Sequence, residues 1–446
     1  MQDDVFFVVY RFYFFCQPEK DPRHIELETY LFQSGIFCVF WLLTCQQNSL
    51  YDIQNGLLAF LPERIAILLG HGEPVRIQRF VQVVRFFENR NVKFINGMKI
   101  HNDIFKRIIS LENLFCAWDE FKKDKRKKKD VMRFEWRLEE NIFRLHYELR
   151  HKHYRHEPYT SFYITDPKVR HIHKATVRDR ILHHAMFAVL NPLFEPSFIP
   201  HSFSCQIGKG MHRGVNVLER MLRQESHNHT KPCFALKCDI QKFFGSVDHD
   251  ILFSILVRRI QDDDALWLIK EIIGSFRSEN TTIFERKGLP IGNLTSQLFA
   301  NIYLNELDQY VKHILRAKKY VRYTDDFVII SEDYTYLANI IMPLREFLAN
   351  RLLLNLHPRK MTIRKFSQGI DFLGYVVLPR YRVLRTKTER RIFRKLHLRT
   401  IDFRNGNIRQ ETLKQSLQSY LGVLSHANAY LLSQELQNHF WYWQNE

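Results

Sequence analysis

The chain has 446 residues, of which 45% are hydrophobic, and its 66 lysines and arginines outnumber its 48 aspartates and glutamates. This hydrophobic content excludes an intrinsically disordered protein, and the length predicts two or three structural lobes. The formal net charge of +18 favours nucleic acid as the partner, with an acidic membrane surface as the weaker alternative. The seven cysteines form no CxxC pair, so we expect neither a disulfide scaffold nor a zinc module, and a reducing cytoplasm fits best.

The first part of the chain, residues 1–97, is an N-terminal extension of uncertain role. Its most apolar run, Tyr30–Cys45, is shorter than a membrane span and is interrupted by polar residues. A buried helix is the first interpretation of this run, and a segment at a membrane interface is the second. The start of the chain lacks the pattern of a signal peptide. A third possibility is that Met98 is the natural start, and overall we expect no membrane association.

The next segments combine basic charge with helical periodicity. The run Lys122–Asp130 indicates an exposed linker or a patch that binds a nucleic-acid backbone. Apolar residues at helical spacing predict one amphipathic helix over Val131–His151. A loose histidine cluster has few acidic partners, so we expect solvated or phosphate-facing side chains and not metal ligands. This cluster comprises His146, His151, His153 and His156.

Short strands and helices then alternate. Tyr163–Lys174 predicts two strands around a turn at Asp166-Pro167, and Thr176–Leu193 predicts a helix. The alternation continues to Tyr375, which indicates an α+β fold. The densely basic Arg380–Arg399 and the helical Glu411–Gln437 predict a small C-terminal helical lobe with one cationic face.

Two acidic sites lie in apolar surroundings. Asp239 lies inside the strand-like segment Ala235–Ile240, where an aspartate is unfavourable unless it is paired or bound to metal. Tyr320–Ile330 predicts a β-hairpin with Asp325-Asp326 as its two-residue tip. Two carboxylates so close together repel unless a cation lies between them. Either segment alone is better explained by a surface turn or an isolated buried aspartate.

Both acidic segments together, in a basic chain, favour nucleotidyl transfer. In that reaction two divalent ions, about 3.5–4 Å apart, activate an attacking hydroxyl and stabilise the leaving oxygen. Hard oxygen ligands suit Mg²⁺, which takes its remaining ligands from phosphates and water. We therefore expect Asp239, Asp325 and Asp326 to hold two Mg²⁺ ions, for which Mn²⁺ can substitute.

An ordered set of motifs resembles those of reverse transcriptases. YTDD is similar to their Tyr-x-Asp-Asp box, and CDIQKFF to the motif that holds their first catalytic aspartate. GLPIGNLTSQLFANIYLNELD resembles their substrate-binding loop and following helix, LNLHPRKM a motif with a lysine near the triphosphate, and FLGY the primer grip. DPKVRHIHKATVRDRIL resembles the fingers motifs. The order is correct from about Val131 to the C-terminus, and the set is far more specific than any single box.

The resemblance implies a right-hand polymerase with fingers, a palm built on an antiparallel sheet, and a helical thumb. Its expected boundaries are 98–216 with 247–295 for the fingers, 217–246 with 296–379 for the palm, and 380–446 for the thumb. The implied activity is RNA-directed DNA synthesis, with a template RNA, a primer or cDNA strand, and dNTPs as partners.

The resemblance also assigns roles to single residues. Phe244 would lie under the sugar and exclude a 2′-hydroxyl, whereas Phe243 would be a core residue because strand neighbours face opposite sides. The backbone carbonyl of Ile240 would be a further metal ligand. The residues expected at the dNTP are Lys168, Arg170, Phe244, Ile291, Gly292 and Lys360. The expected primer grip is Phe372, Leu373, Gly374 and Tyr375. The expected contacts to the nucleic-acid backbone are Arg385, Lys387, Arg390, Arg391 and Arg394.

One departure from the family pattern indicates a subclass. Most members carry Gln-Gly in the loop and end it in Ser-Pro, whereas this chain has Ile291-Gly292 and Ser296-Gln297. IGNLTSQ is similar to enzymes of diversity-generating retroelements, which implies misincorporation at template adenines, an accessory protein subunit, and a bacterial or phage-encoded cytoplasmic enzyme. Ile291 offers only apolar contact where a glutamine could hydrogen-bond the nucleotide. The alternatives are local packing of Ile291 in a group II intron-like or retron-like enzyme of ordinary fidelity, and a nucleic-acid-binding module with an inert acidic tip.

Overall fold

The computed structural model describes residues 92–95, 98–101, 103–166, 168–276 and 286–445. The chain divides into two units, Met1–Arg90 and Asn91–Glu446, and the described residues all belong to the second. The predicted helix over Tyr30–Cys45 lies outside the described residues. So does the N-terminal extension, apart from β1 (Val92–Ile95), which forms a hairpin with β2 (Met98–His101). None of the described helices combines the length and apolar character that a membrane span requires.

A group of helices follows this hairpin, and the longest of them packs against several of the others. They are α6 (Ile104–Ile109), α7 (Leu111–Lys122), α8 (Lys129–Glu135), α9 (Leu138–Arg150) and α10 (Val177–Phe194). The prediction of one helix over Val131–His151 is wrong, because the chain turns at Trp136 and Arg137 between α8 and α9. The side chain of Asn141 donates a hydrogen bond to the carbonyl of Phe134 at 3.1 Å, where α8 ends. The apolar spacing continues across this break, so periodicity alone does not reveal it.

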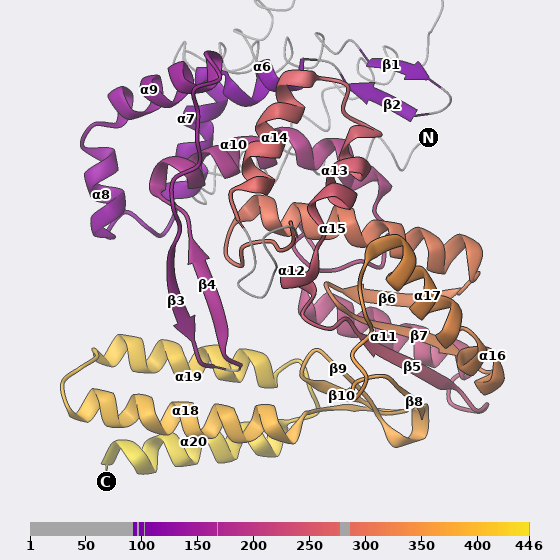
Figure 1. Cartoon of the computed structure of the whole chain (residues 1–446). Helices are drawn as coiled ribbons and strands as arrows, with labels where there is room; N and C mark the ends of the chain where they lie inside the picture. Colours follow the sequence, from indigo (N-terminus) through magenta and orange to yellow (C-terminus); the bar gives the residue numbers. More distant parts are fainter. Residues whose placement is uncertain (1–91, 96–97, 102, 167, 277–285, 446) are drawn as a thin grey trace, which may run out of the picture. The chain divides into compact units, whose positions relative to one another are not determined.

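A long hairpin leaves these helices. β3 (Thr160–Ile164) pairs antiparallel with β4 (Arg170–Lys174), as predicted. Near its turn, Asp166 forms an ion pair with Lys395 of α18 (Thr386–Arg404), and Figure 1 shows the hairpin reaching toward the C-terminal helices. The predicted helix after it is confirmed as α10, and Thr176 caps its N-terminus by accepting a hydrogen bond from the backbone N–H of Asp179.

An antiparallel sheet of four strands lies at the centre of this unit, in the order β6-β7-β5-β8. The strands are β5 (Phe234–Asp239), β6 (Lys319–Tyr323), β7 (Asp326–Ser331) and β8 (Thr362–Lys365). Alternate residues of a strand face opposite sides. Phe327 and Ile329 accordingly join one hydrophobic cluster, whereas Val328 and Ile330 join another. Because both faces are buried, the strand is an unbroken apolar run and not an alternating one.

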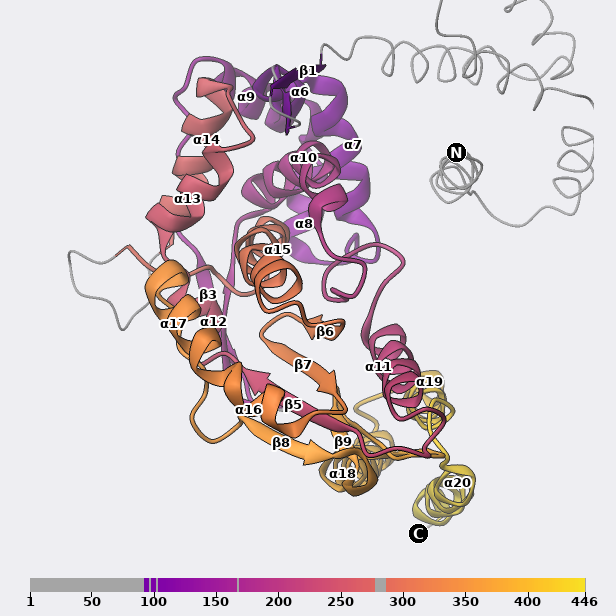
Figure 2. The same cartoon turned by 90° about the vertical axis from the view of Figure 1, so that its right-hand side faces the viewer.

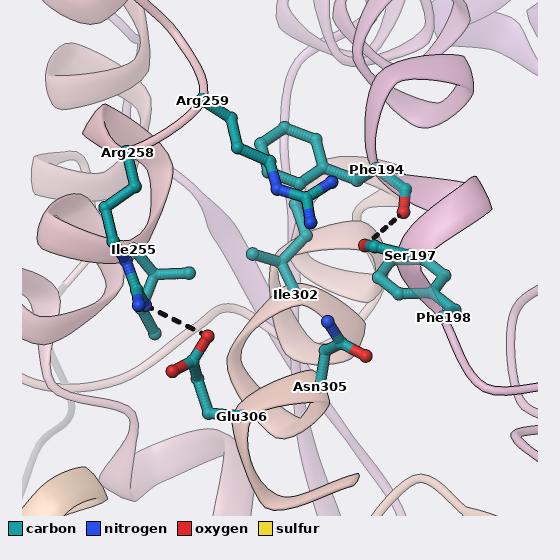
Figure 3. Close-up of a pocket in the computed structure, with 9 residues that line it drawn as sticks. All are labelled: Phe194, Ser197, Phe198, Ile255, Arg258, Arg259, Ile302, Asn305 and Glu306. Atoms are coloured by element: carbon teal, nitrogen blue, oxygen red, sulfur yellow. Dashed lines mark hydrogen bonds and ion pairs between the residues drawn. The ribbon is translucent and has the colours of Figure 1, made fainter. Parts of the chain in front are cut away.

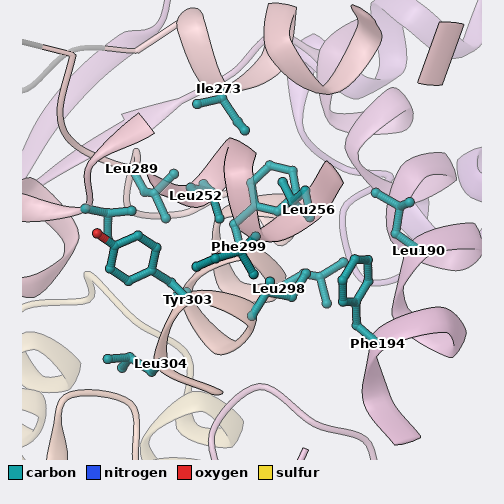
Figure 4. Packing of buried hydrophobic residues seen from close by; sticks show 14 of the residues in the cluster. Leu190, Phe194, Leu252, Leu256, Ile273, Leu289, Leu298, Phe299, Tyr303 and Leu304 are labelled. Carbon is teal, nitrogen blue, oxygen red and sulfur yellow. The ribbon is translucent and has the colours of Figure 1, made fainter. Parts of the chain in front are cut away.

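Helices cover both faces of the sheet (Figure 2). The face of Phe327 is covered by α15 (Leu294–Gln309), α16 (Tyr334–Asn339) and α17 (Ile341–Leu352), and the opposite face by α11 (Met211–Glu225). Behind α15 lie α13 (His249–Val257) and α14 (Asp263–Gly274). Figure 4 shows Leu252 and Leu256 of α13 meeting Leu298 and Phe299 of α15. Each such buried side chain contributes about 1.5–3 kcal/mol to folding.

The C-terminal part is a small sheet followed by three helices. Its strands are β9 (Ile370–Phe372), β10 (Tyr375–Val377) and β11 (Arg382–Leu384), and α19 (Gln410–Leu424) and α20 (Tyr430–Asn445) follow α18. The range Glu411–Gln437 is helical, as predicted, but a break between α19 and α20 divides it. Asn428 lies between α19 and α20, donates to the carbonyl of Arg382 at 2.8 Å, and accepts from the Arg382 N–H at 3.2 Å. This contact with a distant strand holds the connection in a non-helical path.

The remaining short elements are α12 (Phe243–Ser246), the 3₁₀ turns Glu195–Ser197 and Phe366–Gln368, and the π-helical turn Tyr310–Ile314. Together the elements form the predicted α+β fold. The boundaries proposed for fingers, palm and thumb stay a prediction.

A buried polar network joins α10 to the start of α15. The Nδ1 atom of His183 lies 2.8 Å from the hydroxyl of Thr295, and its Nε2 atom lies 3.4 Å from Nε2 of His156. His156 in turn lies 3.8 Å from the carboxylate of Asp179, which accepts a hydrogen bond from the Tyr154 hydroxyl at 2.9 Å. The prediction that His156 is solvated or phosphate-facing is wrong, since only 2% of its side chain is exposed.

These buried histidines predict acid sensitivity of the fold. Burial lowers the pKa of His183 to about 3 and that of His184 to about 4, and it also lowers the pKa of His156. The unfolded chain takes up these protons near pH 6.5, so between pH 6.5 and about 4 it binds more protons than the folded chain. As the pH falls through this range, we expect the free energy of unfolding to fall by about 1.4 kcal/mol per pH unit for each histidine that stays neutral in the folded chain.

Urea denaturation at pH 7, 6 and 5 measures this slope. His183→Gln should reduce the slope, whereas His151→Gln, at an exposed histidine, should leave it unchanged. An unfolding free energy that stays constant from pH 7 to pH 5 would contradict the expectation.

Candidate active site

Two of the predicted acidic residues are cross-strand neighbours. Asp239 is the last residue of β5, Asp326 is the first residue of β7, and the two pair directly in the register of the strands. Cβ atoms of such partners lie about 4.5–5.5 Å apart and face the same side of the sheet. By strand alternation this is the face of Val328, which α11 covers. The fold therefore brings together two segments that are 87 positions apart in the chain (326 − 239).

The third acidic residue lies in the tight turn between β6 and β7. Tyr323 pairs with Asp326, so the two turn residues are Thr324 and Asp325. The predicted tip of Asp325-Asp326 is wrong by one position, because the backbone register places Asp326 in the strand. Thr324 has a φ of 50°, in the left-handed region that this type of two-residue turn requires. The carbonyl of Asp325 accepts a hydrogen bond from the N–H of Ile240 at 3.1 Å, which ties the turn to the residue after Asp239.

Burial shapes the charge of these carboxylates. It raises the pKa of Asp326 to about 6, and it also raises the pKa of Asp325. The negative charge of nearby Asp239 raises both pKa values further. One carboxylate oxygen of Asp326, Oδ1, is buried and has no hydrogen-bond partner. An ionised carboxylate is unfavourable there unless a cation compensates it.

Two lysines supply part of that compensation. The ammonium group of Lys360 lies 2.8 Å from Oδ1 of Asp239, and that of Lys237 lies 3.6 Å from Oδ2 of Asp326. Lys360 is placed by the chain that wraps the end of β5, where the N–H of His357 donates to the carbonyl of Asp239 at 2.7 Å. Sequence reasoning missed Lys237. It lies two positions before Asp239, so strand alternation could have placed it on the same face.

These residues fit a divalent cation in their chemistry. The donors are hard carboxylate oxygens, and the unpartnered Oδ1 of Asp326 is an available ligand atom. Within the described ranges, no group of three or more acidic, histidine or cysteine side chains is arranged to hold an ion by itself. Ligands from a substrate phosphate and from water would therefore have to complete the coordination, as Mg²⁺ usually requires. The role of the Ile240 carbonyl as a ligand stays a prediction.

The two phenylalanines after Asp239 lie in a helical turn. Phe243 is buried in the large core, as predicted, and Phe244 is half-buried. The predicted reason for the burial of Phe243, strand alternation, is wrong. The chain enters α12 through Lys242, whose φ is 45°, so helical geometry and not strand alternation separates the two rings. The role of Phe244 at the sugar stays a prediction.

The loop at 288–293 is fixed between α12 and β4. The N–H of Leu289 donates to the carbonyl of Phe244 at 2.7 Å, and the carbonyl of Ile291 accepts from the N–H of His173 at 3.2 Å. Gly292 has a φ of 118°, and a Cβ atom there would lie 3.3 Å from a methyl group of Ile172. Glycine is therefore favoured at 292 for backbone reasons, whatever its role at a nucleotide.

The structure does not bring the predicted triphosphate residues of the β3–β4 hairpin to the carboxylates. Lys168 and Arg170 are exposed at the tip of the hairpin, beside Asp166, which pairs with Lys395. None of the contacts among the described residues joins Lys168 or Arg170 to the three aspartates. Their predicted role at the triphosphate stays a prediction.

The predicted primer grip is the turn between β9 and β10. Phe372 and Tyr375 are buried and pair across it, while Leu373 and Gly374 have φ values of 51° and 89°. This turn is linked to the acidic site by Lys237, whose ammonium group donates to the carbonyl of Asp371 at 2.8 Å. The neighbouring Tyr375 hydroxyl donates to the carbonyl of Val423 at 3.0 Å, which joins the turn to α19.

The predicted backbone contacts lie at the start of α18 and on its first turns. Lys387, Arg390 and Arg394 are exposed, and their spacing places them on one face of the helix. Arg391 is half-buried, and Arg385 forms an ion pair with Asp371, so the guanidinium of Arg385 has a structural partner. Contact of these residues with nucleic acid stays a prediction.

This face of α18 predicts a change in salt dependence. The double variant Arg390→Gln with Arg394→Gln should reduce the slope of log affinity against log salt by about 2, one for each lost phosphate contact. Fluorescence anisotropy of a labelled primed RNA at several NaCl concentrations measures the slope. Arg399→Gln, on another face of the same helix, is the control. Equal slopes for the double variant and the wild type would show that these two arginines do not contact the phosphates of the RNA.

A pocket elsewhere in the unit is not part of this site. Figure 3 shows it between the end of α10, α13 and α15, with an ion pair of 2.9 Å between Arg258 and Glu306. None of the predicted site residues lines it. Its lining residues are Phe194, Ser197, Phe198, Ile255, Arg258, Arg259, Ile302, Asn305 and Glu306.

Comparison with known proteins defines the class. Residues 165–377 match the family model described as reverse transcriptase (RNA-dependent DNA polymerase). This segment contains the four-stranded sheet and all three aspartates of the candidate site. Residues 165–377 therefore form a reverse transcriptase domain, and the described elements have the fold of a right-hand polymerase.

Individual relatives come from bacteria and fungi. The chain is 26% identical to Protein YkfC of Escherichia coli over 51% of this chain and 68% of that protein. It is 24% identical to the group II intron-encoded protein LtrA of Lactococcus lactis over 63% of this chain and 54% of that protein. A solved telomerase structure from Candida albicans is similar with a TM-score of 0.40 and 12% identity, over 65% of this chain and 55% of that one. The chain thus spans about two thirds of the first relative and about half of the second.

Proposed function

We propose that this chain copies a template RNA into cDNA by two-metal nucleotidyl transfer at Asp239, Asp325 and Asp326. The observation that carries the proposal is the direct cross-strand pairing of Asp239 with Asp326, with Asp325 in the adjoining turn. The reverse transcriptase domain over 165–377 supplies the class of reaction. Divalent ions, when bound, activate the primer hydroxyl and stabilise the leaving pyrophosphate.

The residues around the carboxylates have separate tasks in this proposal. Asp239 and Asp326 would hold the ions from adjacent strands, and Asp325 would hold them from the turn. Lys360, 2.8 Å from Asp239, would bind the triphosphate of the incoming dNTP. Phe244 and the loop at 288–293, which hydrogen-bond to each other through the Leu289 N–H, form the wall beside the sugar.

The proposal is tested by a primer extension assay with the purified chain, a primed RNA template, dNTPs and Mg²⁺. We expect extension products that disappear in EDTA and return when Mg²⁺ or Mn²⁺ is restored. A chain that binds the primed RNA in a salt-dependent manner but never extends it, with or without metal, would instead be a nucleic-acid-binding module.

We further propose that synthesis is error-prone at template adenines and serves sequence diversification with an accessory protein. The proposal rests on Ile291 in the loop at 288–293, and on the resemblance of IGNLTSQ to enzymes of diversity-generating retroelements. The half-buried Ile291 side chain offers no hydrogen bond to an incoming nucleotide, so selection rests on shape alone. The relative in Lactococcus lactis, which is named as intron-encoded, favours the alternative of an intron-type enzyme with ordinary fidelity.

Ile291→Gln separates these alternatives. The substitution should lower the frequency of errors opposite adenine by about 10-fold, the effect expected of one added hydrogen bond worth about 1.4 kcal/mol. Ile291→Leu, which keeps an apolar side chain, should leave the error spectrum unchanged. Deep sequencing of cDNA made on a template of balanced composition provides the measurement. A wild-type spectrum that is flat across the four template bases would support the intron-type alternative.

A further inference from the structure

A fully buried ion pair lies between the β6–β7 hairpin and α15, on the face of the sheet opposite to Asp239 and Asp326. Arg322 of β6 faces away from the carboxylates, toward α15, because it alternates with Val321 and Tyr323 along the strand. Its guanidinium donates two hydrogen bonds to Asp308 of α15, from Nε to Oδ1 at 2.7 Å and from Nη2 to Oδ2 at 2.6 Å. The hydroxyl of Tyr320 donates to the same carboxylate at 2.8 Å. All three side chains have no exposed surface.

The third nitrogen of the Arg322 guanidinium reaches the catalytic turn. Nη1 donates to the carbonyl of Thr324 at 3.2 Å. Thr324 is a β-branched residue in the left-handed region, a conformation that persists only when surrounding contacts hold it. The backbone of Arg322 is itself fixed, since its N–H donates to His201 and its carbonyl accepts from Phe203, both at 3.0 Å.

The turn is therefore held at two consecutive carbonyls from two sides. Arg322 holds that of Thr324 from behind the sheet, and the N–H of Ile240 holds that of Asp325 from β5. Together these bonds fix the peptide planes on both sides of the Asp325 Cα atom. A rotation of either plane would turn the Asp325 side chain away from Asp239 and Asp326.

We propose that Arg322, held by Asp308, is a positioning residue that orients the turn of Thr324 and Asp325 for metal binding and catalysis. This inference rests on the proposed function. A buried ion pair by itself adds little stability, because the desolvation of both charges offsets their attraction. The bond from Arg322 to Thr324 gives the pair a task that an apolar cluster of the same size could not perform.

Replacement of the whole cluster separates positioning from stability. The triple variant Tyr320→Phe, Asp308→Leu and Arg322→Met leaves no charged side chain behind in the core and is expected to stay folded. We expect a kcat for primer extension about 10- to 100-fold lower, the loss of one charge-assisted hydrogen bond to the turn, with the KM for dNTP changed less than about threefold. The concentration of Mg²⁺ at half-maximal rate should rise by a similar factor.

Arg322→Lys provides a second variant that does not depend on the core replacement. It keeps a positive charge opposite Asp308 but lacks the planar fork that reaches Asp308 and Thr324 together. As in the triple variant, its kcat should fall and the concentration of Mg²⁺ at half-maximal rate should rise. The control is Arg258→Gln with Glu306→Gln, which removes a partly exposed ion pair between the end of α13 and α15 and should change neither quantity.

Mn²⁺ binding by electron paramagnetic resonance, without nucleotide, tests the geometry independently of turnover. We expect weaker binding in Arg322→Lys and in the folded triple variant than in the control. Wild-type kinetics and wild-type Mn²⁺ affinity in Arg322→Lys would overturn the inference, whether or not the triple variant folds. A wild-type chain that does not extend primers would overturn the proposed function instead, and the Mn²⁺ comparison would still decide whether Arg322 orients the turn.

Discussion

Asp325→Asn should reduce primer extension by at least about a thousandfold, because the three carboxylates act as one unit and the loss of any member removes most of the rate. The substitution keeps the size of the side chain and takes away the charge that a divalent ion requires. Single-turnover extension of a primed RNA at saturating dNTP provides the measurement. Binding of the same primed RNA should change little, since its affinity depends on the basic surface.

Asp326→Asn should leave the fold at least as stable as that of the wild type. Burial raises the pKa of Asp326 to about 6, so the folded chain holds this proton more tightly than the unfolded chain does. Stability is therefore lost as pH rises from about 4 to 6, and at pH 7 the ionised carboxylate is unfavourable. Asp326→Asn removes this unfavourable buried charge, and we expect the free energy of unfolding at pH 7 to rise by about 2 kcal/mol.

The matched control is Glu332→Gln, an exposed carboxylate just beyond the other end of β7, which should alter neither extension nor stability. Either of two results would contradict the assignment of Asp325 and Asp326 as catalytic residues. One is an Asp325→Asn variant that extends primers at a wild-type rate, and the other is an Asp326→Asn variant that is inactive only because it unfolds.

Arg322→Met alone should destabilise the fold by about 3–5 kcal/mol, because it leaves the carboxylate of Asp308 buried without its partner. Asp308→Leu alone should have an effect of the same size, since it leaves the guanidinium uncompensated. The triple variant that also replaces Tyr320 should recover most of that loss. Urea denaturation of the four proteins measures the coupling between the two charges.

Additive losses in the triple variant would contradict this expectation. They would show that the pair stabilises the fold by more than its desolvation offsets. In the triple variant we expect stability to recover while the catalytic rate does not.

Local sequence signals and contacts between separate segments determine different parts of this fold. The strand at Asp239, the hairpin at Asp325 and the helix α10 follow from local residue patterns, and all three are present. The breaks in α8–α9 and α19–α20 were missed. At Asn428 the cause is a hydrogen bond to β11, which lies about 46 positions away in the chain and leaves no local trace.

The buried charges show the same limit. Arg322 and Asp308 each follow ordinary patterns, one in a basic strand and one at the end of a helix, and nothing local indicates that they meet. His156 lies in a basic segment that predicts a solvated face, yet the packing of α10 buries it beside Asp179. In each case the partner lies on another element of the fold, beyond the reach of a local sequence pattern.

The sequence by itself determined the class of the protein, because motif residues and their order reflect chemistry that tolerates few alternatives. It also determined that Asp239 lies in an apolar strand and that Asp325 and Asp326 lie at the turn of an apolar hairpin. Only the tertiary structure decided that Asp239 faces Asp326 across two strands, that Asp326 belongs to the strand and not to the turn, and that Lys237 and Lys360 neutralise them. The physical reason is strand register, since a shift of one residue would place every side chain on the opposite face, and register is set by contacts between segments.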